Sequence, residues 1–202
     1  SIFAADDAEG DARGRQIRDF HPDIKGVDHH GDRYHALDPD IYWWAHATFT
    51  WEFLRARELY WMRPLRRSEK EQLYAETVTW YRRYGVSERP VPLTLDDFEA
   101  RFEQICRDEL EVTPALEWVL DPESNPAPAG VPVRLPGPLG LLDPIVNPVA
   151  QKLGANVLRT IVFGNMPDTV RRKIGVPWSH LDRATFVAAC ATIRGLEPTM
   201  HL

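Results

Sequence analysis

The segment between Asp38 and Pro64 constrains the fold of this chain more than any other. Asp38 can cap a helix by accepting from a free backbone N–H, and Pro39 suits the first helical turn. No Gly or Pro follows until Pro64, which predicts one long helix over about residues 39–62. Its first half carries aromatic side chains on all sides, and a helix that is apolar all round is buried. The segment therefore predicts an all-α domain built round a buried central helix.

His46 is the only side chain in the aromatic half of this helix that titrates near neutral pH. Residues three and four apart share a helical face, which places five side chains around His46. These are Tyr42, Trp43, Phe49, Thr50 and Phe53. The pattern has two interpretations, a neutral imidazole hydrogen-bonded to a neighbouring helix and an axial ligand of a haem held between apolar walls. For a lone histidine the pattern alone favours the first.

Three segments of the chain resemble the MpaB-like/rubber oxygenase family, which includes latex-clearing protein. They are residues 31–39 (GDRYHALDP) together with Gly26, residues 44–48 (WAHAT), and residues 166–178 (MPDTVRRKIGVPW). The similarity runs from about Gly10 to Trp178 and so covers most of the chain. The WAHAT segment is fairly specific in its context, and the later segment is moderately so.

The resemblance implies an all-helical oxygenase with a non-covalent b-type haem, in which His46 matches the proximal iron ligand. The five side chains around His46 would then wall the haem pocket. Arg18-x-x-His21 followed by Gly26 also resembles the family pattern. Arg18 is a candidate partner for a haem propionate, because guanidinium binds carboxylate in a bidentate manner; an exposed Arg18 beside a helix-capping His21 is the alternative. Dioxygen and a hydrophobic, isoprenoid-like substrate are the implied reactants.

The catalytic group on the other side of such a haem has no candidate in this sequence. The family has an Arg and a Thr near that distal face, in a helical region upstream of the matching segments, and neither can be matched here. We therefore expect residues 1–202 to form a single helical domain that lacks the upstream helical region. A targeting signal would be lost with that region.

Composition excludes several classes of protein. A net charge of −6 leaves no basic surface for DNA or RNA. Cys106 and Cys190 form neither a disulfide framework nor a Cys-x-x-Cys-His haem attachment, which favours a cytoplasmic setting. No apolar run reaches the roughly eighteen residues of a membrane span, although a peripheral membrane contact stays open. Motifs for phosphate binding, serine hydrolysis and di-iron chemistry are missing from the sequence.

Local signals predict the rest of the chain. Ser68 and Glu71 fit a capping box, Thr94 caps the next helix, and Ser179 opens the last one. Residues 28–35 hold three histidines and two aspartates, and we interpret them as a polar turn at Gly31 rather than a metal site. Eight prolines in residues 121–148 predict an extended loop that wraps the surface, and no strands are expected.

Two functions of another class remain open at this point. The same fold without haem would be a binding module for an apolar ligand in the aromatic pocket. Alternatively, the chain could be a non-enzymatic subunit of a larger assembly, with tryptophans such as Trp61 or Trp118 at an interface.

Overall fold

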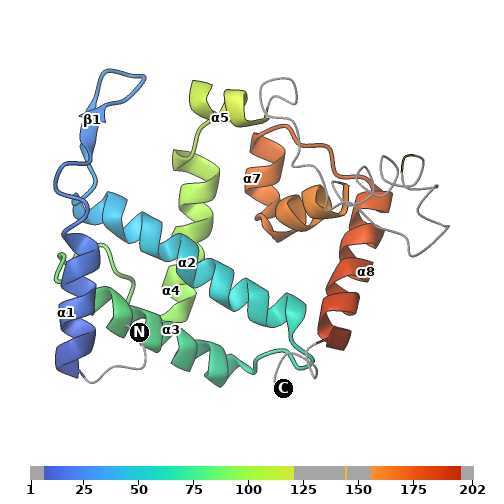
Figure 1. Cartoon of the computed structure of the whole chain (residues 1–202), viewed down its shortest axis with the longest axis horizontal. Coiled ribbons are helices and arrows are strands. Elements are labelled where there is room, and N and C mark those ends of the chain that lie inside the picture. The colour runs from blue at the N-terminus through green and yellow to red at the C-terminus, as the bar shows by residue number, and fades with distance from the viewer. Residues whose placement is uncertain (1–6, 121–143, 145–155, 197–202) are drawn as a thin grey trace. The chain divides into compact units, whose positions relative to one another are not determined.

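The computed structural model describes residues 7–120, 144 and 156–196 (Figure 1). The chain divides into two compact units, residues 1–105 and residues 106–202. The described part of each is mostly helical, which confirms the predicted fold class. The proline-rich loop predicted over residues 121–148 lies outside the described residues, apart from residue 144. The single domain and its wrapping loop therefore stay predictions. None of the described helices is long and apolar enough to cross a membrane.

The first unit contains four helices and a hairpin along its described part (Figure 1). These are α1 (Asp7–Arg18), β1 (Lys25–Val27), β2 (Arg33–His35), α2 (Pro39–Tyr60), α3 (Arg67–Arg83) and α4 (Leu95–Gln104). Helix α3 packs against α1, α2 and α4 and so organises the core of this unit. Helix α2 is the predicted central helix, and Asp38 caps it by accepting from the backbone N–H of Asp40 at 3.0 Å.

Helix α2 is buried on one face only, which corrects the expectation of a helix buried all round. Its buried side chains are Tyr42, Trp43, His46, Ala47, Thr50 and Leu54. Beside them, Ile41, Phe49 and Phe53 are 42%, 56% and 42% exposed. The apolar pattern of the sequence was correct, but the described residues leave these three large apolar side chains exposed.

The hairpin before α2 was not predicted from the sequence. Strands β1 and β2 pair antiparallel, with Gly26 opposite Tyr34. Asp28 closes the turn between them by accepting from the backbone N–H groups of His30 and Asp32, both at 2.9 Å. These bonds favour the carboxylate and lower the pKa of Asp28. Gly31 takes a φ of 92°, so the polar turn predicted at this glycine is confirmed.

Helix α1 approaches the C-terminal end of α3 so closely that the two backbones are in contact. A Cβ at Gly14 would lie 2.2 Å from the carbonyl oxygen of Arg83, where no side chain can fit. A Cβ at Gly10 would instead meet the flexible guanidinium of Arg83. Glycine at position 14 therefore allows α1 to contact α3 and brings the end of α1 close to α2.

The start of α3 differs from the predicted capping box at Ser68 and Glu71. The helix is capped two residues earlier, at Arg66, and Glu69 accepts from the backbone N–H of Arg66 at 2.7 Å and from Arg63 at 2.8 Å. These bonds lower the pKa of Glu69 to about 2. The prediction was wrong because Glu69 lies three residues after Arg66 and competes with Glu71 for the same capping role.

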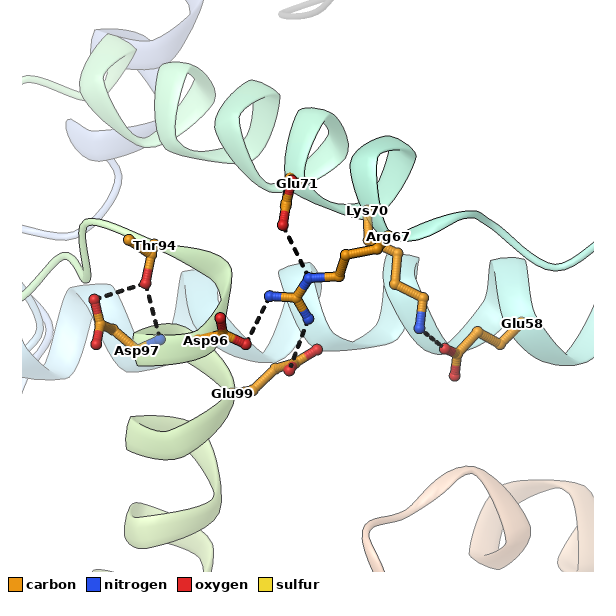
Figure 2. A network of polar contacts seen from close by, with 8 residues as sticks. All are labelled: Glu58, Arg67, Lys70, Glu71, Thr94, Asp96, Asp97 and Glu99. Carbon is orange, nitrogen blue, oxygen red and sulfur yellow. Dashed lines mark hydrogen bonds and ion pairs between the residues drawn. The ribbon is translucent and has the colours of Figure 1, made fainter.

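Glu71 instead accepts from Arg67 at 3.0 Å in a network that joins α3 to α4 (Figure 2). Arg67 also contacts Asp96 at 2.7 Å and Glu99 at 3.5 Å. Such exposed ion pairs contribute little individually. The start of α4 is set by Thr94, which accepts from the backbone N–H of Asp97 at 3.1 Å, as predicted (Figure 2).

The π-helical turn η1 (Ile105–Glu109) begins at the last residue of the first unit. The second unit also contains α5 (Pro114–Leu120), helical residues 156–165, α7 (Asp168–Lys173) and α8 (His180–Leu196). In α7, the Arg171 side chain is buried, with 6% exposed. The guanidinium donates to the Phe163 carbonyl at 2.8 Å, pairs with Asp168, and lies 4.4 Å from the ring centroid of Trp178. Within residues 166–178, which resemble the family motif, Asp168 and Trp178 thus contact one buried arginine, Arg171.

Candidate functional site

His46 points from α2 toward α3. Its Nε2 atom lies 2.9 Å from the backbone carbonyl oxygen of Thr77. A carbonyl can only accept, so Nε2 carries the proton and donates, which leaves the lone pair of the imidazole on Nδ1. His46 is 5% exposed. Its Nδ1 atom is buried and has no hydrogen-bond partner among the described residues.

The aromatic surroundings predicted for His46 are present, but most of the rings come from α3. Trp80, Tyr81 and Tyr84 place their ring centroids 4.8, 5.2 and 5.9 Å from that of His46, each near-perpendicular to it. Edge-to-face contacts of this kind are favourable arrangements of aromatic rings. The signal for them was visible in the sequence as three aromatic residues within five positions, all on one helix.

Burial keeps this part of the molecule uncharged. Desolvation lowers the pKa of His46 to about 4, and the bond to the Thr77 carbonyl opposes part of that shift. The imidazole is therefore neutral at pH 7. Burial also raises the pKa of Tyr42 to about 12 and raises the pKa of Tyr84 above its ordinary value. The phenols keep their protons, so the site is polar without being ionised.

A cavity of about 160 Å³ adjoins His46 and lies against α1 and α2. Ile17, His21, Tyr42, His46, Phe49 and Tyr84 are among its lining residues. Ile41 and Phe49 of α2 both line the cavity and are exposed, so the cavity is open to solvent beside these two side chains. It is smaller than the roughly 300–1,000 Å³ of ordinary small-molecule sites.

The structure brings together only some of the predicted site residues. Tyr42 and Phe49 line the cavity with His46. Trp43 and Thr50 are buried but do not line it, and Thr50 donates to the backbone carbonyl of His46 at 3.2 Å. Phe53 borders a different hollow, beside Arg57 and Leu65, although its ring lies 6.0 Å from that of Trp80.

Arg18 lies outside the cavity lining and pairs with Asp19 at 2.7 Å. Its charge nevertheless acts on Tyr42, where it opposes the rise in the pKa of the phenol. The guanidinium thus lies near the tyrosine wall of the cavity. Its predicted role as a propionate partner stays untested.

The sequence offered a helix-capping His21 only as an alternative and gave no place for it in the site, yet His21 lines the cavity. The residue follows α1, and its Nδ1 donates to the backbone carbonyl of Ile17 at 2.9 Å. Its ring lies 5.4 Å from that of Tyr42 in an edge-to-face contact. The signal in the sequence was the position of His21 within the family-like Arg18-x-x-His21 segment.

The residues round His46 fit a haem iron by their chemistry but not by the space they enclose. A neutral imidazole with one unpartnered nitrogen is a suitable iron ligand, and the aromatic walls suit an apolar ring. A cavity of about 160 Å³, however, does not hold a porphyrin. The buried position of Nδ1 also means that His46 would have to move to present a nitrogen to the cavity.

Comparison with known proteins gives one match. Residues 1–195 match the family described as ER-bound oxygenase mpaB/B'/Rubber oxygenase, catalytic domain. No curated protein and no solved structure matches the chain. The family match covers nearly the whole sequence and includes both the cavity and the Arg171 segment.

Proposed function

The chain belongs to the family of mpaB and rubber oxygenase catalytic domains, and from that premise we propose that it uses a b-type haem with His46 as the residue that binds the iron. Family membership implies an oxygenase catalytic domain, and hence an oxidoreductase that uses dioxygen and an organic substrate. The haem, its ligand and a hydrophobic, isoprenoid-like substrate are the parts that we propose. The distal group remains unassigned, and Arg18 remains the candidate for a propionate.

The unpartnered Nδ1 atom of His46 carries this proposal. A buried acceptor without a partner costs about 1–3 kcal/mol, so its presence at the centre of the aromatic cluster calls for a reason. Metal-bound histidines usually donate their other ring N–H to a carboxylate or backbone carbonyl, and His46 makes that bond to Thr77. Metal binding also requires the neutral imidazole, which burial already provides at pH 7.

A haem supplies dioxygen binding and activation when it is bound, and the protein supplies the environment. His46 would hold the iron, while Tyr42 and Phe49 would exclude water from the site. Because the cavity is too small for a porphyrin, binding of a haem requires apolar surface beyond it. The exposed side chains of Ile41 and Phe49 on α2 offer such surface.

The test is a titration of the full chain with hemin, followed by the Soret absorbance. We expect the wild-type protein to bind hemin with a shifted Soret band and His46→Ala to lose the shift. His35→Ala is the matched control, because His35 is a half-buried histidine outside the cavity that accepts locally from the Leu37 backbone N–H at 3.0 Å. Folded wild-type protein that leaves the hemin spectrum unchanged would contradict the proposal, as would equal binding by His46→Ala.

A second function is favoured by the cavity as it stands. His46 already makes one good hydrogen bond to α3, and the adjoining cavity of about 160 Å³ suits a small apolar ligand without haem. In that case His46 is a buried structural histidine and the chain is a binding module. Wild-type protein that binds small apolar molecules but not hemin would favour this function over the haem oxygenase.

A further inference from the structure

The cavity beside His46 contains a second imidazole, that of His21, which the proposed function does not use. The two rings come from different parts of the fold, since His21 follows α1 and His46 lies in α2. They also differ in which nitrogen is available. Neither nitrogen of His46 is open to the cavity, because Nε2 is bonded to Thr77 and Nδ1 is buried.

The hydrogen bond from His21 Nδ1 to the Ile17 carbonyl fixes the tautomer of the second imidazole. Since that carbonyl can only accept, the proton lies on Nδ1 and the lone pair lies on Nε2. The described residues provide no hydrogen-bond partner for this Nε2 atom. Contact with the edge of Tyr42 then holds the ring in place, so Nε2 is an oriented acceptor rather than a mobile one.

The size of the cavity limits what can occupy it. An apolar cavity of roughly 150 Å³ engineered into another protein stays dry and takes up benzene. The cavity here measures about 160 Å³ and is walled by Ile17, Phe49 and two protonated tyrosines, Tyr42 and Tyr84. One six-membered ring therefore matches the space, and His21 is part of its wall.

We propose that this cavity binds a single-ring apolar group bearing an O–H or N–H, and that His21 Nε2 positions it by accepting that hydrogen bond. The inference rests on the proposed function only for the further claim that the bound ring belongs to the substrate of the oxygenase. The ligand class is a phenol-like ring or the ring end of a larger molecule. His21 is then the polar specificity residue of the site.

The experiment compares phenol with toluene, which have similar shapes but differ in the hydroxyl. Binding to the full, ligand-free chain is followed by chemical-shift changes of cavity residues. The test variant is His21→Asn, whose amide can still donate to the Ile17 carbonyl but lacks a nitrogen at the Nε2 position. His35→Asn is the control, because His35 lies outside the cavity lining.

We expect wild-type protein to bind both probes and His21→Asn to lose about 3- to 10-fold in phenol affinity, the range for one neutral hydrogen bond. Toluene affinity should stay the same in both proteins, and His35→Asn should behave as wild type. An equal loss for both probes would overturn the inference by showing that His21 only packs. Failure of wild-type protein to bind either probe would overturn it as well.

A measurement on the wild-type protein guards against a variant that does not fold. The ¹⁵N shifts of the His21 ring should report the Nδ1–H tautomer, and phenol, but not toluene, should shift the Nε2 signal. An Nε2–H tautomer would overturn the inference directly. Hemin has no part in these measurements, so a protein that discriminates phenol from toluene but rejects hemin refutes the haem proposal and leaves this inference standing.

Discussion

Acid should destabilise this protein through His46, and the structure sets the size of the effect. Burial lowers the pKa of His46 from 6.5 to about 4 in the folded state, while the unfolded chain has the ordinary value. Between these values the unfolded state binds more protons than the folded state, so the free energy of unfolding falls as the pH falls. Stability from the neutral imidazole is fully present above pH 6.5 and is lost progressively down to pH 4.

The shift corresponds to about 3 kcal/mol at 1.36 kcal/mol for each pH unit. His46 is only 5% exposed, so solvent screening leaves most of this figure in place. A loss of this size is a large part of the roughly 5–15 kcal/mol that stabilises an ordinary domain. We therefore expect acid unfolding to begin well above the pKa range of ordinary carboxyl groups.

The assay is urea unfolding at pH values from 7 to 4, followed by tryptophan fluorescence, for wild type and His46→Gln. Glutamine can donate to the Thr77 carbonyl but does not titrate, so its free energy of unfolding should fall less steeply with acid than that of wild type. His180→Gln, which replaces an exposed histidine, serves as the control and should follow wild type. Parallel pH profiles for wild type and His46→Gln would refute the reasoning.

Two packing predictions test the fold that supports the site. Gly14→Ala should destabilise the first unit by about 1–3 kcal/mol, because its Cβ meets the Arg83 carbonyl. Gly10→Ala should cost less, because its Cβ meets a flexible guanidinium, and equal losses of the two variants in urea unfolding would contradict this. Arg171→Lys should cost about 1–3 kcal/mol, because lysine keeps the charge but loses the planar contact with Trp178; an unchanged melting temperature would contradict the structural role of Arg171.

The sequence predicted best what depends on neighbouring residues. The caps at Asp38, Thr94 and Ser179 are confirmed, because a capping side chain bonds to a backbone N–H only two or three residues away. The hairpin was missed because each of its strands has three residues, too few for a period-two pattern. The start of α3 was misplaced because two glutamates, Glu69 and Glu71, compete locally for the same capping role.

Features that depend on distant residues could not be predicted in the same way. Helical spacing placed Tyr42 and Phe49 beside His46, but it could not show that α3 supplies the Trp80 ring and the Thr77 carbonyl. It also could not show which side chains of α2 the rest of the unit covers, nor that Phe53 borders a different hollow from the one that adjoins His46. The contribution of the segment after α1 to the cavity depends on the approach of α1 to α3.

The most direct test of the central claim is the haem content of the full chain purified from haem-supplied cells, beside His46→Ala. We expect a Soret band and about one extractable haem per wild-type chain, and none in the folded variant. Wild-type protein that is folded and free of haem would contradict the claim that this oxygenase domain holds a haem on His46. Equal haem content in the two proteins would contradict the assignment of the ligand.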